Sequence, residues 1–388
     1  MTKRERILNA IHFKPIDRIP LMFRGIPCFT KLLMKYFKIG DQNDPDIIIR
    51  NYKDLLSKLG ADYWSFGSAT YFSNYMPRYI GSYEEYNYID YDYYELFGIE
   101  KTTVTVKNYG YTYKQISKNP LFGCDDYKKV KGILTKKFDL FDYKNSINFW
   151  LNNGKFSDYK SSYAKKVLDY SYMKLEDTII SIGNVMTNPF IFCCSLRGME
   201  NFLMDLVANK KMAEAIIDEV KEFVIEFNRR SLQNTNVKAD LFAAWDDVCM
   251  QDGTMFSIDI FRKHFLPIWK ELISMAKKRN LYFCWHCCGN VNEILPVMID
   301  VGIDIFDVLQ TSAKDMEIDK FYEKFGKDVV VHGGVDVQKL LINGTPQDIK
   351  NEVKKIKELW KTSGGIILGP SHEILPETPI INAISIYK

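Results

Sequence analysis

The sequence predicts an α/β protein, namely a closed (β/α)8 barrel, or TIM barrel, with an inserted hairpin and helical excursion. Short apolar runs alternate with amphipathic segments in the second half of the chain, the pattern of parallel strands connected by helices. The length of 388 residues fits one such barrel better than an open parallel sheet, which is the alternative. We therefore expect a single domain over residues 1–388, with an insertion at about residues 82–175.

The apolar runs are the expected strands. Two of them occur early, as "LMFRG" near residue 21 and "TIISIGN" near residue 178. A connecting helix is expected from Thr345, which can cap it, to Thr362, with Pro346 at its first position. The other strands are expected in the second half of the chain, at residues 239–245, 281–286, 303–309, 328–334 and 364–370.

The insertion is expected because the composition changes after residue 82. The segment to residue 175 is rich in Tyr, Asp, Lys and Asn. Within it, "TTVTVKNYGYTYKQI" alternates β-branched and polar residues around Asn108-Tyr109-Gly110, which is typical of a β-hairpin. We expect this excursion of hairpin and helices to lie near the C-terminal mouth of the barrel.

Charge and composition exclude several classes of function. The formal net charge of +3 indicates neither a nucleic-acid surface nor an acidic partner. The charged N-terminal segment has no apolar run of the signal-peptide type, and no stretch is apolar enough to span a membrane. The eight cysteines are then better interpreted as thiols or metal ligands than as disulfides. We expect a soluble, cytoplasmic protein.

A candidate metal site lies in "CWHCCGN", residues 284–290. Alternate residues of a strand share a face, so His286 and Cys288 point one way at the C-terminal end of the strand. Cys287 then packs against the helix layer, and Cys284 lies deeper in the barrel. Two thiols and an imidazole near a barrel mouth favour zinc, whereas the alternative is a buried cysteine-rich strand with a hydrogen-bonded histidine.

A third ligand has to come from another strand end. His332 and His372 both follow predicted strands, and an aspartate from the pair Asp246 and Asp247 is a further candidate. We expect Asp247 to lie near His286, either in contact with it or separated from it by one side chain. The two acids suit the role of a metal ligand, of a general acid/base, or of a partner that orients histidine. The alternative is that they simply cap the next helix.

Other residues of the expected rim are candidates for substrate binding. Arg24 follows the first strand and suits a carboxylate or phosphate, or a salt bridge at the rim. Next to the glycine pair of "HGGVDVQ", Asp336 and Gln338 are placed to line a pocket, and Gln251 lies in the loop after Asp247. A helix is expected to start at Asn290, with Glu293 three residues on, and would favour a thiolate nearby.

The sequence resembles the uroporphyrinogen decarboxylase superfamily, and within it the cobalamin-dependent methyltransferases. The resemblance covers nearly the whole chain, from "RERILNAIHFKPIDRIP" at the start and "YELFGIE" before the hairpin. Its most specific part is a collinear series: "WDDVCMQDGTMFSIDIFRKHFLPIWKEL", "HCCGNVNEILPVMIDVGIDIFDVLQTSAKDM", "HGGVDVQKLL" and "LGPSHEILPETPIINAISIY".

The resemblance implies a (β/α)8 barrel with its site at the C-terminal mouth. In the methyltransferases a His-x-Cys pair and a later Cys bind zinc, and these positions fall on His286, Cys288 and His372. Histidine in the last position departs from the methyltransferases and resembles the true decarboxylases. The decarboxylases' N-terminal Arg-Gln-Ala-Gly-Arg motif is missing, however, and only Arg24 stands near its place.

Three functions follow as hypotheses. The first is a zinc-dependent methyltransferase that moves a methyl group between a small methylated substrate, such as a methoxy compound, or a thiol and a corrinoid (cobalamin) carried by a partner protein. Asp247 or His332 would supply a proton. The second is a decarboxylase of a tetrapyrrole or a smaller acid, and the third is a catalytically inert binding protein on the same fold.

Overall fold

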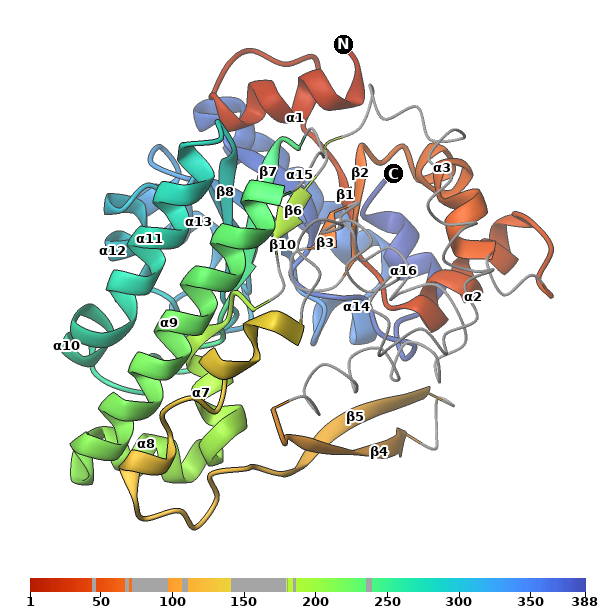
Figure 1. The fold of residues 1–388 in the computed structure, drawn as a ribbon. Helices are drawn as coiled ribbons and strands as arrows, with labels where there is room; N and C mark the ends of the chain where they lie inside the picture. Colours follow the sequence, from red (N-terminus) through yellow and green to blue (C-terminus); the bar gives the residue numbers. More distant parts are fainter. Residues whose placement is uncertain are drawn as a thin grey trace.

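Figure 1 shows the fold in a computed structural model of the chain. The structure describes residues 1–43, 47–66, 70–71, 97–106, 111–140, 179, 181–183, 186–234 and 239–388.

A parallel sheet forms the centre of the described part of the chain. Its strands are hydrogen-bonded in the order β11-β10-β9-β8-β7-β6. Beside β11, single parallel bridges join Leu21 to Leu368 and Gly25 to Ile374, and β1 pairs in parallel with β2. The strands are β1 (Met22–Phe23), β2 (Tyr63–Phe66), β6 (Ser181–Gly183), β7 (Leu241–Trp245), β8 (Tyr282–His286), β9 (Ile305–Leu309), β10 (Val330–Val335) and β11 (Ile366–Pro370).

One layer of buried side chains receives a residue from almost every one of these strands. Met22 of β1, Tyr63 of β2 and Cys284 of β8 belong to it, with their counterparts on the strands between. Such a layer is typical of the interior of a TIM barrel. The strands pair in parallel, so the predicted α/β arrangement is confirmed. Among the described residues no strand pairing joins β2 to β6, so closure of the barrel stays a prediction. The layer comprises Met22, Tyr63, Ile179, Leu241, Ala243, Cys284, Ile305, Val330 and Ile367, with Ile7 and Ile11 of α1 packed against it.

The seven predicted strands are all present, although each is shorter than its apolar run. Two further strands were not predicted: β2, and the short β3 (Thr70–Tyr71), which pairs antiparallel to β2. The helix expected after Asn290 starts later than predicted, at Leu295 of α12. Asn290 Oδ1 does accept from the amide of Asn292, in the turn that precedes this helix.

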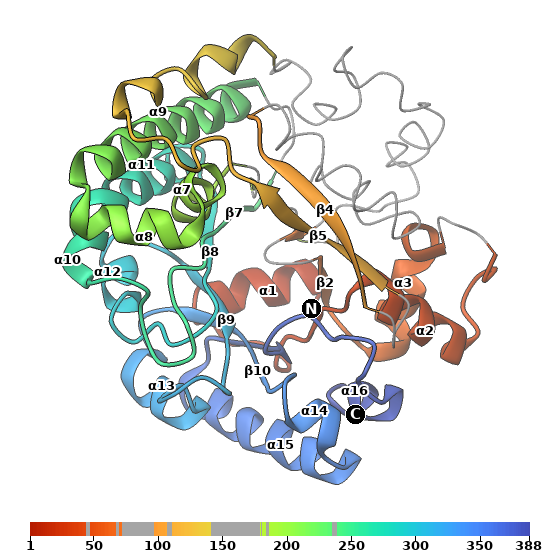
Figure 2. The ribbon, with the colours of Figure 1, turned by 90° about the horizontal axis from the view of Figure 1, so that it is seen from below.

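Most of the helices lie around the outside of the sheet, whereas α1 lies across one end of it, against the interior layer (Figure 2). The predicted helix after Thr345 is confirmed as α15, with a reciprocal cap between Thr345 and Asp348. A π-helical turn, Phe261–Phe265, precedes α11, whose Pro267 lies in its first turn. The helices are α1 (Lys3–Ile11), α2 (Pro27–Phe37), α3 (Ile47–Leu59), α7 (Pro189–Arg197), α8 (Met199–Ala208), α9 (Lys210–Asn234), α10 (Ile258–Ile260), α11 (Leu266–Lys277), α12 (Leu295–Asp300), α13 (Ile318–Phe325), α14 (Leu340–Asn343), α15 (Pro346–Ser363) and α16 (Ile380–Ser385).

The predicted hairpin is confirmed as β4 (Glu100–Val106) and β5 (Tyr111–Lys118), paired from Val106↔Tyr111 outward. Its turn residues, and residues 82–96 and 141–175 of the expected insertion, lie outside the described residues, so the extent of the insertion stays a prediction. The hairpin lies at the end of the molecule where α7 follows β6, opposite α1 (Figures 1 and 2).

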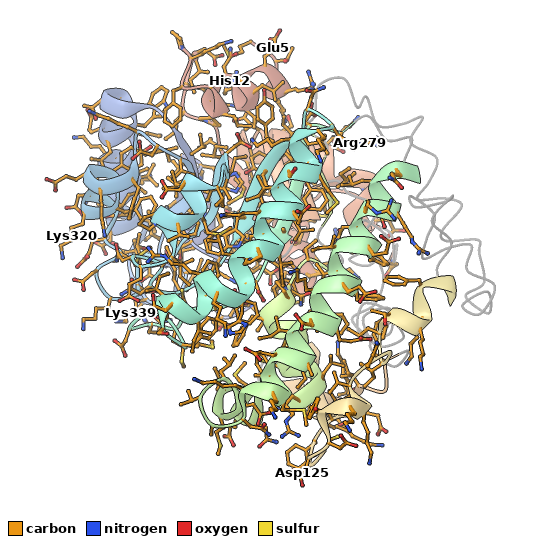
Figure 3. All side chains as sticks on the ribbon, turned by 60° about the vertical axis from the view of Figure 1, so that its left-hand side comes forward. Glu5, His12, Asp125, Arg279, Lys320 and Lys339 are labelled. Carbon is orange, nitrogen blue, oxygen red and sulfur yellow. The ribbon has the colours of Figure 1, made fainter. Side chains whose placement is uncertain are left out.

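The segment after the hairpin is tied to the end of α7. The guanidinium of Arg197 donates to the carbonyl oxygens of Leu121 and Cys124, and Asn119 donates to Ser195. Figure 3 shows Asp125, in this segment, at the opposite end of the molecule from Glu5 and His12 of the N-terminal region. Across the described residues, no helix combines the length and the apolar character needed to cross a membrane.

Candidate metal site

The faces of β8 follow the predicted alternation. Cys284 belongs to the interior layer, whereas Phe283 and Trp285 pack outward, both against Trp269 of α11. His286 is therefore directed inward, two residues above Cys284 and at the C-terminal end of the strand. The strand ends at His286, so the loop that follows, rather than strand pairing, places Cys288.

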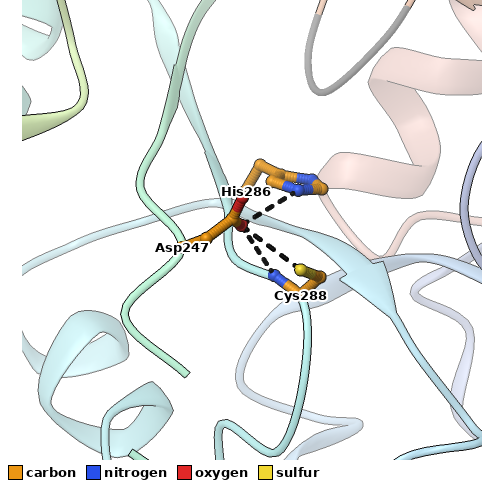
Figure 4. Close-up of side chains that lie close together, drawn as sticks. All are labelled: Asp247, His286 and Cys288. Carbon is orange, nitrogen blue, oxygen red and sulfur yellow. Dashed lines mark hydrogen bonds and ion pairs between the residues drawn. The ribbon is translucent and has the colours of Figure 1, made fainter. Parts of the chain in front are cut away.

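Asp247, His286 and Cys288 come together beyond the end of β8, as predicted for Asp247 and His286 (Figure 4). Asp247 Oδ1 lies 3.6 Å from His286 Nε2 and 3.4 Å from Cys288 Sγ. His286 is fully buried, whereas the side chain of Asp247 is 32% exposed. One oxygen, one nitrogen and one sulfur atom thus face a common point that is open on one side.

The loop after β8 holds Cys288 by close contact between two backbones. Gly289 has φ +93°, and a Cβ atom there would lie 2.6 Å from the carbonyl oxygen of Met250. The amide of Gly289 donates to Gln310 Oε1 at 2.9 Å, and the amide of Asn290 donates to the same Met250 oxygen at 2.8 Å. Glycine is required here because any side chain would displace the loop and, with it, Cys288.

Beneath the cluster, the next inward-facing layer is polar. Arg24, His286, Asp307 and His332 each stand two residues after a member of the apolar interior layer, and all four are at most 1% exposed. Period-two alternation therefore directs them to the same side of the sheet as that layer. These polar side chains therefore form a second layer on the same face of the strands as the apolar layer, two residues closer to the C-terminal strand ends.

Asp307 connects this polar layer. Its Oδ2 lies 2.7 Å from His286 Nδ1, its Oδ1 lies 3.1 Å from His332 Nδ1, and Arg24 Nη1 lies 3.0 and 3.1 Å from its two oxygens. His332 Nε2 is in turn 2.7 Å from the hydroxyl of Tyr63. Burial alone raises the pKa of a carboxyl, but the Arg24 guanidinium beside it holds the pKa of Asp307 well below its usual value.

His372 lies one ring away from the cluster. Its ring centroid is 5.8 Å from that of His286, in an edge-on arrangement. Burial, and secondarily the charge of Arg24, lowers the pKa of His372 to about 3, so that its ring is neutral and able to act as a ligand. The expected ligand His372 is thus near the site, while the three donor atoms that converge belong to Asp247, His286 and Cys288.

The other predicted site residues have partners of their own. Asp246 is fully buried and accepts from the amides of Phe190 and Ile191 at the start of α7. Asp336 accepts from the amides of three residues that follow it, including Gln338. Gln338 Oε1 accepts from Ser312, and Gln251 is exposed with its carbonyl bonded to Lys314. A role for any of them in substrate binding stays a prediction.

The residues of the cluster fit a zinc ion. His286 Nε2 is buried and has no hydrogen-bond partner, and Asp247 Oδ1, 3.6 Å away, is too distant for such a bond. Two ligands held at about 2.0–2.3 Å in tetrahedral geometry lie roughly 3.5 Å apart, close to the two distances from Asp247 Oδ1. Burial and the neighbouring Asp247 raise the pKa of the Cys288 thiol, so a nearby cation is needed to hold it as thiolate.

Sequence reasoning missed Asp307 and Tyr63. A signal existed for Asp307, because an acidic side chain in the middle of the buried run "IDIFDVL" is unusual without a partner. Tyr63 carried no such signal, since β2 itself was not predicted and tyrosines are frequent in this chain.

The chain is similar to proteins of known families and names. The family described as uroporphyrinogen decarboxylase (URO-D) matches residues 153–386. A methylated-thiol–coenzyme M methyltransferase of Methanosarcina mazei is 26% identical over 218 residues, which cover 53% of this chain and 56% of that relative. A methylcobamide:CoM methyltransferase of Methanosarcina acetivorans is 24% identical over 268 residues, which cover 68% of this chain and 73% of the relative.

The fold as a whole also has a solved counterpart. A methyltransferase from Methanosarcina mazei superposes with a TM-score of 0.62 at 20% sequence identity, covering 100% of this chain and 97% of that one. At this identity the likeness establishes the shared fold.

Proposed function

Because this chain belongs to the uroporphyrinogen decarboxylase (URO-D) family, we propose that it is a zinc-dependent methyltransferase of the corrinoid-using kind. It would move a methyl group between a small methylated substrate, such as a methoxy compound, or a thiol and a corrinoid carried by a partner protein. Its similarity to a methylated-thiol–coenzyme M methyltransferase and to a methylcobamide:CoM methyltransferase supports the reaction class.

One observation carries the proposal: the buried His286 Nε2, without a partner, converges with Cys288 and Asp247. A lone pair and a carboxylate facing each other repel unless a cation lies between them. His286 and Cys288 would hold the zinc, with Asp247 the nearest third donor and His372 the next. A bound zinc ion supplies Lewis acidity, which either polarises a methoxy-type heteroatom or lowers the pKa of a thiol.

The surrounding residues divide the remaining tasks. His286 and Cys288 fix the site, and Asp247, with its side chain 32% exposed, faces the open side where substrate arrives. Asp247 is placed to hold the ion or to deliver a proton to the leaving group. His332 is less suited to that second task, because both of its ring nitrogens already bond, to Asp307 and to Tyr63.

The decarboxylase hypothesis needs cationic groups for the substrate's carboxylates. Arg24, the only arginine that the sequence offered for this purpose, is fully buried against Asp307. A site with a single thiolate among its ligands also leaves zinc more electrophilic than an all-thiolate site would. We therefore favour removal of a methyl group from a small methoxy-type substrate over activation of a thiol.

Two measurements test the proposal. The metal content of protein purified under reducing, zinc-replete conditions should approach one zinc per chain. A screen of methoxy compounds and thiols, with a reduced corrinoid protein as methyl acceptor, should show formation of methyl-cobalt by absorbance. Conversion of uroporphyrinogen without zinc would establish the decarboxylase instead, and zinc binding without turnover of any substrate would favour the inert binding protein.

A further inference from the structure

The carboxylate of Asp307 is shared by two histidines whose other nitrogens have different fates. Its two oxygens receive Nδ1 of His286 and Nδ1 of His332, at 2.7 and 3.1 Å. An ionised carboxylate only accepts hydrogen bonds. Each Nδ1 must therefore carry a hydrogen, which leaves Nε2 of each neutral ring as the atom with the free lone pair.

That lone pair is used in one ring and left over in the other. Nε2 of His332 accepts from the hydroxyl of Tyr63 at 2.7 Å, which satisfies it inside the protein. Nε2 of His286 has no hydrogen-bond partner and faces Asp247 and Cys288. The same carboxylate thus fixes the same tautomer in both histidines. Only His286 presents a nitrogen with an unused lone pair to the open side of the site.

Arg24 completes the arrangement, because it supplies the positive charge that a fully buried carboxylate requires. Its Nη1 lies 3.0 and 3.1 Å from the same two carboxylate oxygens that the histidines contact.

We propose that Asp307 is a positioning residue, which fixes the Nδ1–H tautomer of His286 so that Nε2 is presented to a metal ion, and that Arg24 supplies the counter-charge of the buried Asp307 carboxylate. The inference rests on the proposed zinc site for its consequence, but the tautomer itself is a property of the metal-free protein. It assigns a role in metal binding to two residues that do not contact the metal.

The substitution Asp307→Asn tests this inference with little change of shape. Asparagine offers one acceptor and one donor where aspartate offers two acceptors, so only one of the two histidines can keep its Nδ1–H bond. We expect zinc affinity, measured by competition with a chelating dye, to fall about 10- to 100-fold, the usual effect of losing a carboxylate behind a ligating histidine.

Because Asp307→Asn also leaves Arg24 buried without its counter-ion, a double variant is needed. Arg24→Met/Asp307→Asn removes both charges and should recover most of the melting temperature while zinc affinity stays low. Recovery of zinc affinity together with stability would show that Asp307 is only the counter-ion of Arg24 and would overturn the proposal. Tyr63→Phe serves as the control: it removes the partner of His332, leaves His286 untouched and should change zinc affinity less than about twofold.

The tautomer can be read directly in metal-free protein labelled with 15N-histidine. Long-range 15N–1H spectra should show Nδ1–H for His286 and for His332, assigned by the loss of each signal in His286→Asn and His332→Asn. An Nε2–H signal for His286 would overturn the inference. If the tautomer is as expected but the wild type binds no zinc, the zinc proposal fails while the positioning by Asp307 stands.

Discussion

Asp246 and Asp247 are consecutive in the chain, yet their carboxylates contact different parts of the molecule. Asp246 is fully buried and receives two amides from the start of α7, at 2.8 and 2.9 Å. Asp247 lies between His286 and Cys288 at the open side of the candidate site. The pair thus combines a helix cap with a site residue, two of the roles that the sequence left open.

This division gives a matched pair of substitutions. Asp246→Ala leaves two buried backbone amides without an acceptor and should lower the free energy of unfolding by about 1–2 kcal/mol. The zinc content of the folded protein should not change. Asp247→Asn should leave stability within about 0.5 kcal/mol and lower either zinc content or turnover. Denaturant unfolding and metal analysis of both variants check the contrast, and the same effect on zinc in both would contradict it.

The two neighbouring thiols give a second pair. Cys288→Ala should lower zinc affinity by more than about 100-fold. A thiolate bound directly to the ion contributes more than a group that only orients a ligand, whose loss costs about 10- to 100-fold. Cys287→Ala should retain zinc and lose only about 1 kcal/mol of stability, since Cys287 is buried in the outer core and directed away from the site. Zinc per chain in both proteins is the measurement, and equal loss would mean that the loop presents Cys287 instead.

Gly289→Ala should damage the site through the backbone. The added Cβ would meet the Met250 carbonyl oxygen at 2.6 Å, so the loop that carries Cys288 has to move and zinc affinity should fall at least tenfold. Gly60→Ala is the control, since Gly60 also has positive φ, +69°, but open space around its Cβ position. It should cost about 1–2 kcal/mol in unfolding experiments and leave zinc binding intact.

Metal-free protein should lose stability in mild acid partly through His372. Burial, with a contribution from Arg24, lowers the pKa of His372 to about 3 in the folded protein, against about 6.5 in an unfolded chain. The unfolded chain therefore binds the extra proton first, and this contribution is present above pH 6.5 and lost as the pH falls toward 3, at a slope of at most about 1.4 kcal/mol per pH unit.

The variant His372→Asn should flatten this part of the pH profile. Denaturation midpoints of the two proteins, measured with a chelator present between pH 4.5 and 7, should converge as the pH falls. Parallel profiles would show that His372 is as accessible to protons in the folded protein as in the unfolded chain.

The parts of the fold that rest on periodicity could be predicted from the sequence. Apolar runs predicted seven strands, and the alternation of Cys284, Trp285 and His286 predicted which side chain enters the barrel. The chemistry of Thr345 and Pro346 likewise predicted the start of α15. These features depend on local sequence and on burial, which a single chain displays directly.

Features that depend on partners distant in sequence could not be predicted. Asn290 has the composition of a helix cap, but its side chain bonds within a turn and α12 starts later, at Leu295. Arg24 looked like a substrate-binding group because nothing in the sequence shows that β1 and β9 bring it to Asp307, 283 positions away. Proximity across a barrel is a property of strand order, which residue patterns do not encode.

The origin of Arg24 and Tyr63 has a consequence for how the protein matures. Both precede residue 153, where the family match begins, whereas the histidines and the aspartate that they contact lie within it. Only after the first two strands have docked does the buried anion gain its counter-ion and His332 its phenol. On the proposed zinc binding, the ion is therefore held most tightly once these strands have docked, so that zinc affinity would report the docking of both chain ends.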